Sequence, residues 1–168
     1  MRETSLMLEY LKKNFFSNLL IIIIIFSLDR ISKFYVIFKS ETNLSSSLYT
    51  SKFLNINLIW NEGIAFGLLS FDEKFYYNIL TIIIILITLI IMFLMIRAKR
   101  MEKISYSFII GGSFGNITDR LYYSAVPDFI DIYINNFHWF IFNVADIFIT
   151  LGIISLISIE VLNKKIEK

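Results

Sequence analysis

The chain alternates long apolar runs with shorter polar segments, and four of the runs predict membrane-spanning helices. We expect spans at about 15–38, 75–96, 104–123 and 139–161, because a helix needs about 20 apolar residues to cross a bilayer. A cleaved signal peptide is the alternative for the first run, but no A-x-A-like cleavage site follows it, so we favour an uncleaved helix. The pattern predicts an all-α membrane protein, with residues 1–168 forming a single four-span domain.

One long segment, residues 39–74, lies outside the predicted spans. Its first part is rich in Ser, Thr and Asn and predicts a loop, whereas 52–60 (KFLNINLIW) partly alternates and predicts a strand. A turn is expected at 61–63 (NEG), and the apolar run 64–71 suits either a strand or an interfacial helix. We therefore expect a small β-rich platform that lies on the outer, extracytoplasmic surface of the membrane.

Positive charge is concentrated on one side of this four-span arrangement. Ten of the 16 Lys and Arg residues fall in the N-terminal segment 1–13, the loop 97–103 and the tail 163–168. These three segments share one side of the membrane, and basic residues accumulate in cytoplasmic loops. The sequence therefore predicts a multi-pass protein with both termini in the cytoplasm.

A set of charged and amide side chains interrupts the apolar runs, and the same topology places all of them near the outer ends of the spans or in the outer loop 128–138. An ionised carboxylate at the centre of a membrane helix costs roughly 2.5–3.5 kcal/mol, so several of them together indicate a function. The set comprises Asp29, Lys33, Asn116, Asp119, Arg120, Asp128, Asn143 and Asp146.

Paired aspartates at one depth suggest acid–base chemistry. Two carboxyl groups a few ångströms apart share one proton, so the ionised group can accept a proton from water while the neutral group polarises a carbonyl. The alternative is that the carboxylates only pair with Arg30, Lys33 or Arg120 to hold helices together. Spacing alone leaves both interpretations open.

Other chemistries have less support in the composition. The chain has no cysteine and a single histidine, His138, which excludes thiolate sites and makes a zinc site improbable. Net charge is only +2, which gives a nucleic-acid partner no electrostatic support. A Ser–Lys dyad drawn from Ser32 or Ser40 with Lys33 or Lys39 is a weaker alternative, because serines near helix ends are common. We expect no metal or organic cofactor.

Five short motifs then occur in order across about residues 27–152. They are DRISK at 29–33, NEGIAFG at 61–67, GGSFGNITDR at 111–120, VPDFI at 126–130 and FNVAD at 142–146. Together they resemble the motifs of lipoprotein signal peptidase, or signal peptidase II, a bacterial inner-membrane aspartic protease. One departure is Pro127, where that family usually has a second valine. Proline lacks an N–H and fixes φ, so it could shift the segment that carries Asp128.

The resemblance implies an enzyme that cuts prolipoproteins on the amino side of a cysteine carrying diacylglycerol. By the resemblance, Asp128 and Asp146 are the catalytic dyad, and Asp119 is structural, held by Arg120 or a neighbour. We expect a monomer in the bacterial inner membrane, with prolipoproteins and membrane lipids as partners and no nucleic acid. The residues expected to bind substrate or support the site are Asp29, Lys33, Asn61, Gly63, Phe66, Asn116, Asp119, Arg120, Asn143 and Ala145.

Two rival functions use the same polar residues. A small transport or channel subunit could carry protons or ions on Asp119 and Asp146. A proton path should spread its polar groups across the membrane, whereas here they gather at one depth. The second rival is a non-enzymatic assembly factor, which would tolerate substitution of Asp146.

Overall fold

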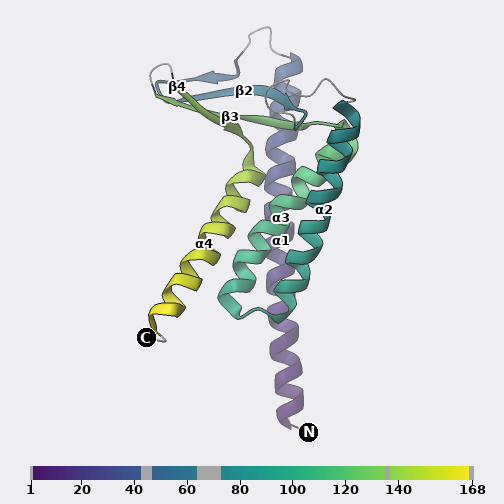
Figure 1. Cartoon of the computed structure of the whole chain (residues 1–168), viewed down its shortest axis with the longest axis vertical. Coiled ribbons are helices and arrows are strands. Elements are labelled where there is room, and N and C mark those ends of the chain that lie inside the picture. Colours follow the sequence, from purple (N-terminus) through teal and green to yellow (C-terminus); the bar gives the residue numbers. More distant parts are fainter. Residues whose placement is uncertain (1, 43–46, 64–72, 135–136, 167–168) are drawn as a thin grey trace.

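The computed structural model describes residues 2–42, 47–63, 73–134 and 137–166. Its helices are α1 (Arg2–Thr42), α2 (Glu73–Arg97), α3 (Arg100–Tyr123) and α4 (Val144–Ile166). Its strands are β1 (Tyr49–Thr50), β2 (Leu54–Asn61), β3 (Val126–Ile134) and β4 (Phe137–Phe142). The strands form one sheet that lies across one end of the helices, and both chain ends lie at the opposite end (Figure 1).

Helices occupy all four predicted spans, although their bounds differ from the predicted ones. Within the described residues, Phe75–Arg97 and Val144–Lys165 are long and apolar enough to cross a membrane. The helix α1 has 41 residues and extends beyond the predicted span at both ends. Large apolar side chains on the outer faces of α2 and α4 are exposed, as lipid-facing surfaces would be. The four-span topology itself stays a prediction.

The predicted combination of helices with a small β-rich part is confirmed, but the β-rich part is larger than expected, because the chain forms a four-stranded antiparallel sheet in the order β1-β2-β3-β4. The strand predicted at 52–60 is confirmed as β2. By contrast, the predicted loop 128–138 and the first residues of the fourth predicted span form β3 and β4. Short apolar runs rich in aromatic and β-branched residues suit a strand as well as a helix, which explains the error. The run 64–71 lies outside the described residues.

The register of the sheet explains why Pro127 is compatible with a central strand. Asp128 pairs with Ile59 of β2, and Pro127 pairs with Trp60. Pairing of β3 with β4 begins only at Ile130, so the proline lies where β3 has β2 as its single strand neighbour. Proline is tolerated in sheets at such edge positions, near the start of a strand.

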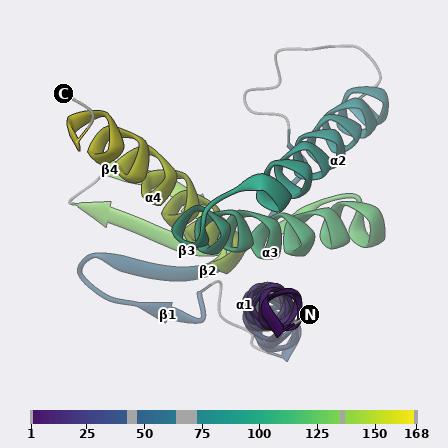
Figure 2. The same ribbon diagram turned by 90° about the horizontal axis from the view of Figure 1, so that it is seen from below.

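Glycines allow α3 to approach two other helices closely. A Cβ on Gly111 would lie 2.9 Å from Cβ of Ile25 in α1, and one on Gly115 would collide with the Asp29 carboxylate. Gly112 faces the other side, where a Cβ would lie 2.5 Å from the carbonyl oxygen of Ala145 in α4. Viewed along α1, the other three helices lie to one side of it (Figure 2). This packing brings polar residues of three helices to the sheet.

Candidate active site

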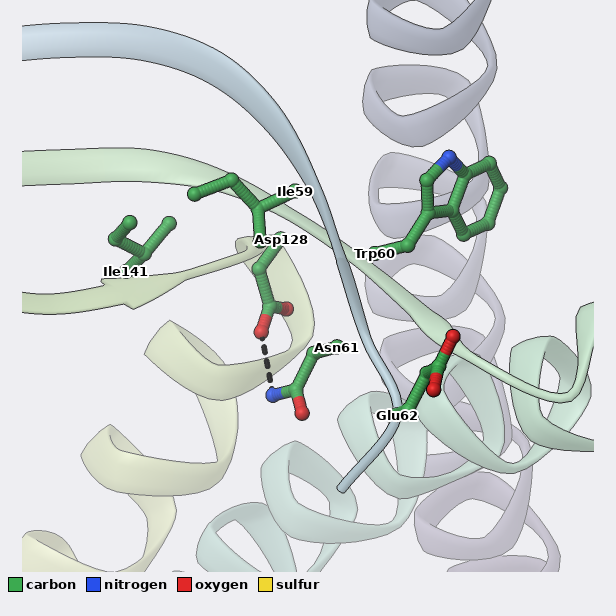
Figure 3. Close-up of a pocket in the computed structure, with 6 residues that line it drawn as sticks. All are labelled: Ile59, Trp60, Asn61, Glu62, Asp128 and Ile141. Atoms are coloured by element: carbon green, nitrogen blue, oxygen red, sulfur yellow. Dashed lines mark hydrogen bonds between the residues drawn. The ribbon is translucent and has the colours of Figure 1, made fainter. Parts of the chain in front are cut away.

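An open pocket of about 390 Å³ lies where β2, β3 and β4 meet the helices (Figure 3). Asp128 is the buried carboxylate in its wall, with 4% of the residue exposed. The six residues that line the pocket are Ile59, Trp60, Asn61, Glu62, Asp128 and Ile141.

Asp128 is held by two side-chain amides from different elements. Nδ2 of Asn61 donates to its Oδ2 at 2.8 Å, and Nδ2 of Asn143 donates to its Oδ1 at 2.6 Å. Asn61 is itself oriented, because its Oδ1 accepts a 2.8 Å hydrogen bond from the backbone N–H of Gly63. Burial raises the pKa of Asp128 above its ordinary value, and the nearby charge of Asp146 acts in the same direction, against the lowering effect of the two amides.

Asp146 occupies the first turn of α4 and forms a reciprocal cap with Asn143. The backbone N–H of Asn143 donates to Oδ2 of Asp146 at 3.1 Å, and the backbone N–H of Asp146 donates to Oδ1 of Asn143 at 3.2 Å. This is the arrangement of a capping box, which fixes both side chains at the start of the helix. Nδ2 of Asn116 in α3 donates to the other carboxylate oxygen at 2.8 Å. One residue, Asn143, therefore binds both carboxyl groups.

Behind this pair lies a buried ionic cluster between α1 and α3. Nζ of Lys33 lies 2.9 Å from Oδ1 of Asp29 and 2.7 Å from Oδ2 of Asp119, and it donates to Oδ1 of Asn116 at 2.8 Å. Asp29 and Lys33 are four residues apart on α1, which places them on the same face of the helix. Arg30 contacts both aspartates as well, so two carboxylates face two cations and the cluster is neutral in formal charge.

Two features of this cluster differ from expectation. Asp119 was expected to be held by Arg120 or a neighbour, and the residues that hold it are Arg30 and Lys33 of α1. The sequence indicates Arg30 only as a possible ion-pair partner, because its contact with Asp119 joins two residues that are 89 positions apart in the chain. The cluster also reaches α4, since the backbone N–H of Ala145 donates to Asp29 at 3.0 Å.

Most of the predicted site residues thus join one hydrogen-bonded network, and the remainder lie elsewhere. Arg120 lies beside Gly63, which adopts a φ of +77° that favours glycine. Phe66 lies outside the described residues. The hydroxyls of Ser32 and Ser40 donate to backbone carbonyls of their own helix, which lends the weaker Ser–Lys alternative no support.

The described residues around the two carboxyl groups include no set of ligands for a metal ion. Among the residues that the structure describes, no three His, Cys, Asp or Glu side chains gather closely enough to hold a metal ion. His138 instead pairs with Asp131 on the sheet, with 2.9 Å between Nδ1 and Oδ2. The arrangement that the site does offer is two carboxyl groups with shared amide donors, beside an open pocket.

Residues 21–162 match a family model described as signal peptidase (SPase) II. The chain belongs to the signal peptidase II family. It is 49% identical to a lipoprotein signal peptidase of Pelagibacter ubique (strain HTCC1062), over 91% of this chain and 93% of that protein. It is 37% identical to a lipoprotein signal peptidase of Rickettsia canadensis (strain McKiel), over 96% of this chain and 83% of that one.

The fold agrees with solved structures of bacterial membrane enzymes. One determined at 2.3 Å resolution superposes with a TM-score of 0.72 and is 28% identical, covering 90% of this chain and 92% of its own. A second, at 1.9 Å resolution, gives a TM-score of 0.69 at 30% identity, covering 84% and 90%. As a signal peptidase II, the chain is a peptidase of lipoprotein processing and a bacterial membrane protein.

Proposed function

We propose that this signal peptidase II is an aspartic endopeptidase that uses Asp128 and Asp146 to activate water. It cuts prolipoproteins on the amino side of the cysteine that carries diacylglycerol. The observation that carries the proposal is that Asn143 donates hydrogen bonds to both carboxyl groups at the edge of an open pocket. Such a pair can share one proton, which is the requirement of aspartic-protease chemistry.

The two environments suggest a division of roles within the dyad. Burial raises the pKa of Asp128, which favours its neutral form and makes it the donor that polarises the scissile carbonyl. Asp146 receives hydrogen bonds on both oxygens and lies at a helix N-terminus, where negative charge is stabilised. Asp146 is therefore the base that removes a proton from the attacking water.

The proposed reaction conserves its protons. Water adds to the carbonyl carbon, one of its protons passes to Asp146, and the proton of Asp128 moves to the developing oxyanion. When the tetrahedral intermediate collapses, the carbonyl re-forms and returns a proton to Asp128. The C–N bond breaks as Asp146 gives its proton to the leaving amine of the modified cysteine.

The remaining site residues serve as supports in this proposal. Asn61, Asn116 and Asn143 orient the two carboxyl groups, and Asp29, Lys33 and Asp119 fix α1 to α3. Ala145 links Asp29 to the start of α4 through its backbone N–H. Gly63 and Arg120 lie at the turn next to the pocket, and Phe66 belongs to the same motif in the sequence.

The membrane topology fits this placement of the site. Both chain ends lie far from the sheet (Figure 1), and ten of the 16 basic residues fall in 1–13, in 163–168 and in 97–103, where α2 ends and α3 begins. We propose that this end is cytoplasmic, that four helices span the bacterial inner membrane as a single-domain monomer, and that the sheet lies at the outer surface. A lipid-modified cysteine anchored in the outer leaflet would then lie beside the pocket.

The test is cleavage by the purified full-length protein of a prolipoprotein with and without the diacylglyceryl group. We expect cleavage of the modified precursor only, and mass spectrometry should place the new amino terminus at the modified cysteine. Cleavage at another bond, or equal cleavage of both precursors, would overturn the proposed specificity. Proton flux through vesicles without any cleavage would favour the transport alternative.

A further inference from the structure

Polar atoms without hydrogen-bond partners lie at the sheet end of α2 and α3. Tyr77 is only 6% exposed, and its hydroxyl is buried without a partner among the described residues. The Nε and Nη1 atoms of Arg120 are likewise buried and have no hydrogen-bond partner among the described residues. The guanidinium carbon of Arg120 lies 5.3 Å from the centre of the Tyr77 ring, so the unsatisfied groups are neighbours. Buried donors without acceptors are costly and rare, which points to an acceptor supplied from outside.

These groups lie next to the pocket that contains Asp128. A Cβ on Gly63 would lie 3.1 Å from Nη1 of Arg120 and 3.7 Å from Cδ2 of Tyr77, so the turn at Gly63 rests on both side chains. That turn also carries Asn61 and Glu62, which line the pocket (Figure 3). The ends of α2 and α3 accordingly lie beside the sheet (Figure 1).

The short distance along the chain between Asn61 and Gly63 indicates which hydrogen-bond acceptor could reach Tyr77 and Arg120. Gly63 follows Asn61 by two residues, which corresponds to at most about 7 Å of chain. Because an extended peptide advances about 3.3–3.6 Å per residue, a substrate cut at Asp128 would place a carbonyl one or two residues from the scissile bond near Arg120. A guanidinium and a neutral hydroxyl donor suit such a carbonyl oxygen.

We propose that Tyr77, beside Arg120 that is already expected to bind substrate or support the site, completes a carbonyl-binding subsite, in which the Tyr77 hydroxyl donates to a backbone carbonyl of the substrate near the cleaved bond. Tyr77 lies outside the five sequence motifs and makes no contact with either aspartate of the dyad in the described structure. Its role is therefore to bind and position the substrate. This inference rests on the proposed function, because it assumes that a peptide is bound and cut beside Asp128.

The test combines a minimal substitution with substrates that lack one carbonyl. Tyr77→Phe removes only the hydroxyl, and folding should survive because that hydroxyl has no partner to lose. The matched control is Tyr76→Phe, the same change one residue earlier on α2. Lipid-modified peptides carry an (E)-alkene in place of one amide at the first or second position from the scissile bond. Ester analogues at the same positions keep the carbonyl and control for loss of the N–H.

We expect Tyr77→Phe to lower kcat/KM on the parent peptide by a few-fold to about tenfold, the size of one hydrogen bond, and Tyr76→Phe to leave it unchanged. The alkene at one position should lower the wild-type rate by a similar factor and cause no further loss in Tyr77→Phe. Full additivity of the two losses, or a Tyr77→Phe rate equal to wild type, would overturn the subsite.

A binding measurement separates this inference from the proposed reaction. Affinity for the parent peptide is compared between Asp128→Asn and the double variant Asp128→Asn/Tyr77→Phe, neither of which needs to cleave. We expect weaker binding by the double variant, and equal affinities would overturn the subsite. A wild-type protein that binds the peptide but does not cut it would contradict the proposed function and leave the binding comparison valid.

Discussion

The side-chain amide of Asn143 donates a 2.6 Å hydrogen bond to Oδ1 of Asp128, while the backbone N–H of Asn143 donates a 3.1 Å hydrogen bond to Oδ2 of Asp146, three positions later. One residue thus fixes a strand carboxylate relative to a helix carboxylate. Asp128 and Asn143 lie at the same end of the β3–β4 pair, because Ile130 pairs with Phe142, and Asn143 leads directly into α4.

Substitutions at Asn143 should separate its two roles. Asn143→Ser keeps an N-cap oxygen but is too short to reach Asp128, whereas Asn143→Ala loses both contacts. We expect both variants to lose a few-fold to about tenfold in kcat, the range for one hydrogen bond to a neutral group, because Asp128 is the neutral member of the dyad. Only Asn143→Ala should also lose about 0.5–2 kcal/mol of stability through the lost cap. Kinetics and thermal unfolding in detergent would measure the two effects, and a fully active Asn143→Ser would contradict the assignment.

The pH dependence of cleavage should report the raised pKa of Asp128. A carboxyl group with a raised pKa keeps its proton to higher pH, so activity that needs neutral Asp128 should fall as pH rises past the folded-state pKa. We expect this alkaline limb of kcat/KM to lie above the ordinary carboxyl range. Asn61→Leu removes a hydrogen bond that lowers this pKa, so it should move the limb to still higher pH. A limb that moves to lower pH in Asn61→Leu would contradict the assignment of the limb to Asp128.

The ionic cluster should behave as structural support. Asp119→Asn leaves Lys33 and Arg30 facing Asp29 alone, and breaking a buried pair in this way typically costs about 3–5 kcal/mol. Adding Lys33→Met restores the charge balance, so the double variant should lose less stability than the sum of the two single variants. Thermal unfolding of the four proteins forms the required cycle. Strict additivity would show that the buried charges do not act together.

Close helix packing at Gly112 predicts a strong effect of a single methyl group. Gly112→Ala places a Cβ 2.5 Å from the backbone carbonyl oxygen of Ala145, and backbone cannot move aside as a flexible side chain can. We expect a loss of about 1–3 kcal/mol in stability, together with reduced activity because the start of α4 carries Asp146. Thr118→Ala, at an exposed position of the same helix, is the control and should change little. Equal stability of the two variants would contradict the packing.

The sequence predicts which polar residues form the network more accurately than it predicts the helices and strands that carry them. Apolar run length indicated the helices, and the depth of the interruptions indicated that Asp29, Lys33, Asn116, Asp128 and Asp146 would meet. The strand that carries Asp128 falls mostly in the predicted loop 128–138, although Ile130, Ile132 and Ile134 alternate with period two. That alternation is short and closely follows a proline, which makes it a weak indicator of a strand.

Two residues had no local signal that could reveal their place. Arg30 contacts Asp119 across the interface of α1 and α3, and a single sequence does not show which helices touch. Tyr77 stands inside an uncharged run that predicts only a membrane span, so its buried hydroxyl becomes informative only beside Arg120. Contacts between residues on different helices cannot be read from the spacing of residues along one chain.

The central claim is that Asp128 and Asp146 carry the chemistry while Asp119 supports the fold. The most direct test measures cleavage of a diacylglyceryl-modified prolipoprotein by wild type and by Asp128→Asn, Asp146→Asn and Asp119→Asn, with membrane insertion and unfolding temperature recorded for each. We predict that the first two variants insert and fold but do not cleave, and that Asp119→Asn is less stable yet keeps partial activity per folded molecule. A folded but inactive Asp119→Asn alongside an active Asp128→Asn would contradict the account.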